Sequence, residues 1–265
     1  MRNIFTIANK ELSIYFTTVT GYAGFGAYAF LMGLVFVTSL NHFQQLTQNY
    51  LGQQRPELLE TLNFNDQIVQ PMMSTGVWMF LFFVPFLTMR LFAEEKSSRT
   101  FELLMTTPVT SLSMVLGKFL AVAVMIVTMC AIPLVFPLIL DVYGATSSSG
   151  SPVEWAPIWS GTLSVVLMGL SFCAAGLLVS SATESQIVAA LLTFAALLLA
   201  FVLPMIAGRL EGDWRTVVEY ASPLSHVGRG VLGRLLLSDL VFFVSAIALM
   251  LFMTVRVVES HRWRG

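Results

Sequence analysis

A polar stretch near the carboxyl end holds residue types that could act as a nucleophile with its base. Glu219, Ser222 and His226 lie close together there. A serine becomes a nucleophile when a histidine takes its proton and a third group orients that histidine. This spacing arises by chance in many polar loops, and no further acids, bases or metal ligands gather beside it. We therefore expect no catalytic residue in this chain.

The histidines and cysteines give no metal or redox site either. His42, His226 and His261 are far apart in the sequence. Cys130 and Cys173 both fall in long apolar runs, where a thiol behaves as a small apolar side chain. We expect no disulfide, no metal site and no cofactor bound by this chain.

A phosphate-binding loop is also missing. Gly117 and Lys118 are its nearest approach, but Ser111 and Leu112 stand where a glycine is needed. Phe119 follows where Ser or Thr would hold magnesium. Any ATP used with this chain would have to bind a different subunit.

The composition indicates a membrane protein. Of 265 residues, 56% are hydrophobic and 11% charged, whereas soluble domains carry about 25% charged residues. The apolar runs are continuous, which favours helices over barrel strands. We predict an all-α polytopic protein forming a single domain, 1–265. Its six transmembrane helices are expected at about 21–40, 72–92, 119–140, 159–180, 187–207 and 235–255.

Charged groups are scarce inside these spans. Asp239 is the one carboxylate within them, about one turn from the expected outer end of the last span. Ion-coupled carriers usually place ionisable groups within the membrane. An ion-coupled transporter or channel therefore remains an alternative, as does, with less support, a membrane-embedded enzyme.

The distribution of basic residues predicts the topology. Of the 14 Lys and Arg residues, nine lie in segments on one side, which include both termini, and five lie on the other. The positive-inside rule then places both termini in the cytoplasm. A net charge of −1 gives no reason to propose nucleic acid as a partner.

Two amphipathic segments flank the spans. Residues 3–16, with Lys10 and Glu11, show helical spacing of apolar residues and predict an interfacial helix; packing on a cytoplasmic subunit is the alternative. The stretch 209–234 mixes charges with apolar residues. It predicts an amphipathic or re-entrant outer segment before the last span.

The longest inner connection, 93–118, carries most of the inner charge. Glu95 and Arg99 are spaced i,i+4, and Arg99 and Glu102 i,i+3, which indicates a charged helix face. Phe101, Leu104 and Met105 supply an apolar face. Pro108 should end this helix, and Thr110 or Ser111 should cap the next. Periodicity alone leaves open a solvated loop that only joins two spans.

Several motifs resemble those of type-2 ABC exporter permeases, particularly the branch associated with gliding motility and copper-enzyme maturation. The matching residues are Ala8 to Leu12, Glu94 to Lys96, Thr100 to Leu104, Thr107 to Val109, Gly117 with Lys118, Ser222 to His226, and Gly230. Arg99 departs from the pattern, because relatives commonly have Gly there. The local backbone at this position is therefore in question.

This resemblance implies a function and partners. The permease would transmit ATP hydrolysis by two ABC ATPase subunits, which bind the ATP and magnesium, to export or to force transmission in the cell envelope. A second permease, identical or related, and an additional envelope protein are implied partners within the lipid bilayer. The resemblance assigns ATPase docking to Glu94, Glu95, Arg99, Phe101, Glu102 and Leu104. It also marks Lys10 and Glu11 in the interfacial helix and Ser222, Pro223 and His226 in the outer segment.

Overall fold

The computed structural model describes the chain except residues 1, 54–61, 102–108, 144–152 and 263–265. Glu102 and Leu104, both expected in the docking segment, lie outside the described residues, as does Pro108. The elements are α1 (Arg2–Thr17), α2 (Val19–Gly52), η2 (Asn65–Val69), α3 (Gln70–Thr88), α4 (Arg90–Ser97), α6 (Ser111–Ala131), η3 (Ile132–Leu134), α7 (Val135–Tyr143), α8 (Trp155–Ala182), α9 (Gln186–Ala207), α10 (Asp213–Ala221), α11 (Pro223–Val231) and α12 (Leu237–Arg262).

Six helical stretches are long and apolar enough to cross a bilayer, which confirms the predicted all-α polytopic class. They are Gly21–Gly52, Asn65–Ser97, Ser111–Tyr143, Trp155–Ala182, Gln186–Ala207 and Leu237–His261. The first is longer than the expected 21–40. At roughly 1.5 Å per residue it exceeds the roughly 30 Å thickness of the hydrocarbon layer.

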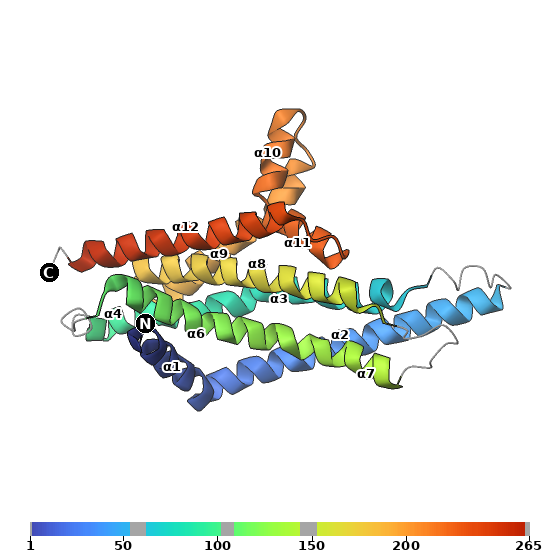
Figure 1. The fold of residues 1–265 in the computed structure, drawn as a ribbon, viewed down its shortest axis with the longest axis horizontal. Helices are drawn as coiled ribbons and strands as arrows, with labels where there is room; N and C mark the ends of the chain where they lie inside the picture. Colours follow the sequence, from blue (N-terminus) through green and yellow to red (C-terminus); the bar gives the residue numbers. More distant parts are fainter. Residues whose placement is uncertain (1, 54–61, 102–108, 144–152, 263–265) are drawn as a thin grey trace.

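The helices form an elongated bundle with both termini at the same end (Figure 1). We call this the terminal end, and the other the far end. The central helix is α8, which packs against α3, α4, α6, α9, α11 and α12. Helix α1 packs across α6 and α2 at the terminal end, and α10 projects away from the bundle (Figure 1).

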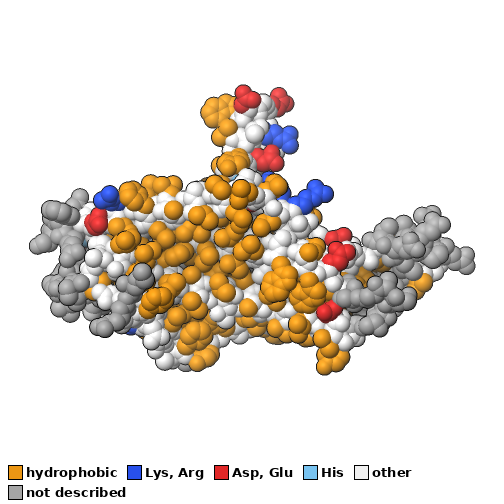
Figure 2. Space-filling view, viewed as in Figure 1, with side chains coloured by type: hydrophobic (Ala, Val, Ile, Leu, Met, Phe, Trp, Pro, Cys, Tyr) orange, Lys and Arg blue, Asp and Glu red, His pale blue; other side chains and the backbone are white. Residues whose placement is uncertain are grey.

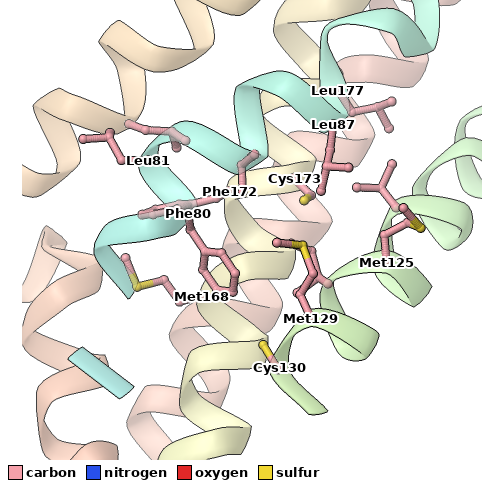
Figure 3. Packing of buried hydrophobic residues seen from close by; sticks show 14 of the residues in the cluster. Phe80, Leu81, Leu87, Met125, Met129, Cys130, Met168, Phe172, Cys173 and Leu177 are labelled. Carbon is pink, nitrogen blue, oxygen red and sulfur yellow. The ribbon is translucent and has the colours of Figure 1, made fainter. Parts of the chain in front are cut away.

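The core lies where α3, α6 and α8 meet (Figure 3). Phe80, Met125 and Phe172 are buried in this cluster. Glycines on α8 permit the close approach: a Cβ at Gly169 would lie 2.8 Å from Ile126 Cγ2 and 3.0 Å from Phe80 Cε2. Small residues on α8 therefore bring its neighbours within van der Waals contact.

The surface around this core is itself apolar. Figure 2 shows hydrophobic side chains covering the middle of one face, with charged groups on the projecting arm and toward the ends. Soluble proteins rarely expose contiguous apolar patches of more than a few hundred Å². Since hydrocarbon is as apolar as these side chains, the surface fits a lipid environment.

The third span is interrupted at a proline. A 3₁₀ turn, η3, separates α6 from α7 and contains Pro133, and Pro137 follows in α7. Proline lacks the amide hydrogen that an α-helix needs, so the turn tightens there. The interruption of the third span therefore lies at Pro133.

The glycine contacts give a stability test. Replacing Gly176 by Ala should lower the thermal unfolding midpoint in detergent, because its Cβ would lie 2.3 Å from Thr88 Oγ1. Overpacking of this kind costs about 1–3 kcal/mol. Gly26→Ala is the control, since nothing lies within 4 Å of its added Cβ. Equal midpoints for both variants would contradict the described packing of α8 on α3.

Candidate functional site

A buried lysine organises the terminal end of the bundle. Lys118, in α6, is 1% exposed. Its Nζ lies 2.9 Å from Glu11 Oε1 of α1 and 2.8 Å from Glu95 Oε1 of α4. An ammonium group leaves water only if it is paired, because its desolvation costs several kcal/mol. The two carboxylates thus compensate this buried charge and join α1, α4 and α6.

The sequence places Glu11 at this position through the apolar stripe of α1. Ile4, Ile7 and Ala8 face the bundle, and Glu11 follows at helical spacing and is also buried. Gly117 allows the close approach, since its Cβ would lie 2.8 Å from the Ile7 side chain. Gly117 and Lys118 therefore have a packing role, which explains this pair without a phosphate loop.

Helix α4 is also fastened to α8. The Ser180 hydroxyl accepts hydrogen bonds from the backbone amides of Phe92 (3.1 Å) and Ala93 (3.2 Å) and donates one to the Met89 carbonyl (3.2 Å). These groups lie where α3 gives way to α4. A side chain of α8 thus satisfies backbone groups at this junction and fixes the direction of α4.

A second tie joins α1 to the same junction. The Tyr15 hydroxyl donates a hydrogen bond to the backbone carbonyl of Leu87. Burial raises the pKa of the Tyr15 phenol above its usual range, so the phenol keeps the proton that it donates. Tyr15 therefore holds the end of α3, which directly precedes α4, and Lys118 holds α4 itself through Glu95.

Among the predicted docking residues, Phe101 is buried against other residues of this chain. It is 7% exposed and meets the rings of Phe92 and His261 edge to face. Lys96 lies over its ring at 5.5 Å and also contacts His261 Nε2 at 3.0 Å. The docking role of Phe101 stays a prediction, and a Phe101→Asp variant would disturb the fold as well as docking.

The remaining described docking residues differ in exposure. Glu94 is half-exposed and pairs with Arg90 at 2.8 Å. The expected ion pair of Glu95 with Arg99 is wrong, since Glu95 turns toward Lys118 and lies 3.7 Å from Lys10. Arg99 is exposed and leaves the helix with a φ of 56°. This left-handed residue directly follows the end of α4, at a position where glycine is favoured, so the glycine that the resemblance implies here would fit this backbone.

A cleft opens beside the Lys118 cluster. It measures about 220 Å³ and is lined by charged side chains of α1, α4 and α6 together with Ser98 and Thr100. Three of its lining residues are cations and three are carboxylates: Lys10, Arg90, Lys118, Glu11, Glu94 and Glu95. The balanced charge indicates a structural junction more than a site for an ion of one sign.

In the outer segment, the histidine is tied to the last span. His226 is fully buried; its Nδ1 lies 2.6 Å from Asp239 Oδ1, and its Nε2 donates to the Tyr220 carbonyl at 2.8 Å. Arg229 also pairs with Asp239. Ser222 is buried beside the start of α11 without a hydrogen-bond partner for its hydroxyl among the described residues.

This geometry does not assemble a nucleophile. Both ring nitrogens of His226 are engaged by groups other than the Ser222 hydroxyl, and Glu219 is exposed beside Arg215. Asp239 forms an ion pair with Arg229 and contacts His226, so the carboxylate near the start of α12 is already paired. The contacts of His226 and Arg229 with Asp239 hold α11 against α12. Within the described residues there is also no group of three or more His, Cys, Asp or Glu able to hold a metal.

Six apolar spans, with an amphipathic helix and a charged junction at one end, define a multi-pass membrane protein. The family model described as ABC-2 family transporter protein matches residues 36–258, most of the chain, and the chain belongs to that family. It is thus an ABC transporter permease, a kind of membrane subunit that works with an ABC ATPase. No individual curated protein matches it. The particular branch expected from the sequence stays a prediction.

The Lys118 cluster predicts a large effect of a single substitution. Lys118→Met leaves Glu11 and Glu95 without their buried cation and with only the exposed Lys10 nearby, which should lower the free energy of unfolding by about 3–5 kcal/mol. Thermal unfolding in detergent measures this. Lys10→Met is the control, since the Lys10 side chain is 57% exposed and should matter little. Equal losses in both variants would contradict the account.

Arg99 gives a prediction of the opposite sign. Arg99→Gly should raise the free energy of unfolding by about 1 kcal/mol, because glycine adopts the left-handed region without a Cβ penalty. Ser98→Gly, at a φ of −85°, should lower it instead. Denaturant or thermal titration compares the two; a loss of stability in Arg99→Gly would be inconsistent with this backbone.

Proposed function

We propose that this permease couples ATP hydrolysis by two partner ABC ATPase subunits to export of a substrate or to force transmission in the cell envelope. The terminal end, with α1, α4 and both chain ends, faces the cytoplasm of a bacterial inner membrane. The ATP and magnesium are bound by the ATPases, and this chain contributes no catalytic residue. A second permease, identical or related, completes the membrane part, and an additional envelope protein is a further partner.

The observation that carries the proposal is the fastening of α1, α4 and α6 around Lys118. Movement applied to a loosely attached helix would be lost in local rearrangement. Here α4 is held by the Lys118 ion pairs, by Ser180 and, through Leu87, by Tyr15. A partner that pushes on α4 therefore moves α1, α3, α6 and α8 together, as a rigid-body transition requires.

Exposed residues at the end of α4 supply the contact. Ser97, Ser98, Arg99 and Thr100 are exposed and directly precede the rest of the docking segment. Arg99 adds a cation that the chain's own described ion pairs do not use. An acidic or hydrogen-bond-accepting surface on the ATPase would pair with it.

Purification of the chain from its native membrane in mild detergent tests the assignment. We expect a stoichiometric ATP-binding subunit by mass spectrometry and vanadate-sensitive ATP hydrolysis in the same sample. Any further membrane chain would show whether the second permease is identical. A homo-oligomer with no ATP-binding subunit would overturn the proposal and favour an ion-coupled carrier.

A charge reversal tests the docking surface. Arg99→Glu should lower ATP hydrolysis by the assembled complex by about tenfold or more, because a charge-assisted contact is lost and a repulsion replaces it. Arg215→Glu is the matched control, since Arg215 is also exposed but lies in α10. Unchanged hydrolysis in Arg99→Glu, with normal expression, would remove Arg99 from the interface.

A further inference from the structure

Two contiguous cavities lie between α3, α8 and α11 toward the far end. One, of about 150 Å³, has polar residues along part of its lining: Asn63, Asn65, Asp66, Gln70 and Glu154. The other, of about 240 Å³, is lined mainly by apolar residues of α3 and α11: Val77, Trp78, Leu224, Val227 and Val231. Both share Gln70, Val231 and Leu232 and are therefore neighbours; we call the pair the amphipathic groove.

The groove runs from the far end toward the middle of the membrane span. Gln70 begins α3 at the far end, and Trp78 lies two turns further along, or roughly 12 Å at 1.5 Å per residue. The polar cavity thus lies nearer the far end of the bundle, and the apolar one lies nearer its middle. This order is the one in which an amphipathic molecule would lie.

A buried acceptor in the polar cavity lacks a donor. Asn65 is 4% exposed, and its Nδ2 donates to the Glu154 carbonyl at 2.7 Å. This contact fixes the amide orientation, because a flipped amide would set two oxygens against each other. Asn65 Oδ1 then has no hydrogen-bond partner among the residues that the structure describes. Buried polar atoms are usually satisfied, so this one indicates a missing donor.

The backbone at Asn65 is unusual as well. Asn65 begins η2, a π-helical turn over Asn65–Val69 that precedes α3. Such turns are rare and occur frequently at functional sites, since they place one side chain out of helical register. Here the turn sets Asn65 against Glu154 at the beginning of α8.

The charge of the polar cavity's lining indicates the charge of the headgroup that the cavity would bind. Asp66 and Glu154 are carboxylates, and the described lining of the polar cavity contains no Lys or Arg. Asp66 Oδ1 accepts from Gln70 Nε2 at 2.6 Å, which orients the carboxylate. A cationic group that donates hydrogen bonds would meet both the carboxylates and Asn65 Oδ1, whereas an anion would be repelled.

The apolar cavity fits a hydrocarbon chain. Trp78 is 53% exposed, and its ring packs on Phe201 at 4.7 Å, which leaves the rest of the indole toward the surroundings. Gly228 lines the same cavity, and nothing lies within 4 Å of an added Cβ there. This position therefore has open space that a larger side chain could fill without striking the protein.

We propose that this groove binds an amphipath with an amine headgroup and a single hydrocarbon chain, and that this is the class of molecule the permease exports. The second clause rests on the proposed transport function; the binding site does not. The ammonium group binds Asp66, Glu154 and Asn65. The hydrocarbon chain contacts Trp78, Leu224 and Val227.

The test uses the full-length permease in phosphatidylcholine nanodiscs without an ATPase. A photoactivatable dodecylamine is crosslinked, and labelled peptides are mapped by mass spectrometry. We expect labels on α3 and α11, displaced by dodecylamine at concentrations about tenfold lower than by dodecanol, which lacks the charge. Labels spread over the lipid-facing surfaces, with equal displacement by both, would mean partition into the bilayer only and overturn the site.

Two variants separate the headgroup from the chain. Asp66→Asn combined with Glu154→Gln should remove the preference for dodecylamine over dodecanol, since both carboxylates are neutralised. Gly228→Phe should abolish labelling of the groove, because its ring fills the apolar cavity. Gly26→Phe, on α2, is the matched control and should label as wild type does. Wild-type displacement in both groove variants would refute the proposal.

Because no ATPase is present, failure of the proposed coupling to ATP hydrolysis would not affect this labelling measurement.

Discussion

One buried ion cluster decides how the terminal end of this permease is built. The Lys118 ammonium group is removed from water and has Glu11 and Glu95 as its compensating charges. Moving either carboxylate away from Lys118 is unfavourable, since an unpaired buried charge costs several kcal/mol. The cluster thus fixes the positions of α1 and α4 on the base of α6. A partner's push on α4 then reaches the spans.

The rest of the junction depends on this arrangement. Once Lys118 sets the position of α4, the Ser180 hydroxyl can bond the amides of Phe92 and Ala93, and α8 carries the movement along the bundle. At the far end, α8 lies beside the amphipathic groove through Ile158 and Glu154. A single central helix therefore contacts both the Lys118 junction, which we propose faces the ATPases, and the proposed binding groove.

The sequence predicts the spans because hydropathy and length suffice to recognise a helix that crosses a bilayer. It does not predict that Lys118 meets Glu11, because 107 positions separate them. One local signal existed: Glu11 continues the apolar stripe of Ile4, Ile7 and Ala8, where a lone carboxylate needs a partner. The Glu95–Arg99 pair failed because helical spacing was assumed to continue through Arg99. No sequence pattern predicts the π turn at Asn65. The groove therefore could not be predicted from the sequence, because it depends on how the helices pack in three dimensions.

The central claim is that α1 and α4 move as one body when the ATPases close. Spin labels at Asn9 and Ser97, both exposed, report the distance between these helices by pulsed electron paramagnetic resonance. The complex is compared without nucleotide and after trapping with ATP and vanadate, with arrested hydrolysis as proof of trapping. The account predicts the same distance distribution in both states. A distribution that shifts on trapping would show that the two helices move separately, and would contradict the role given to Lys118.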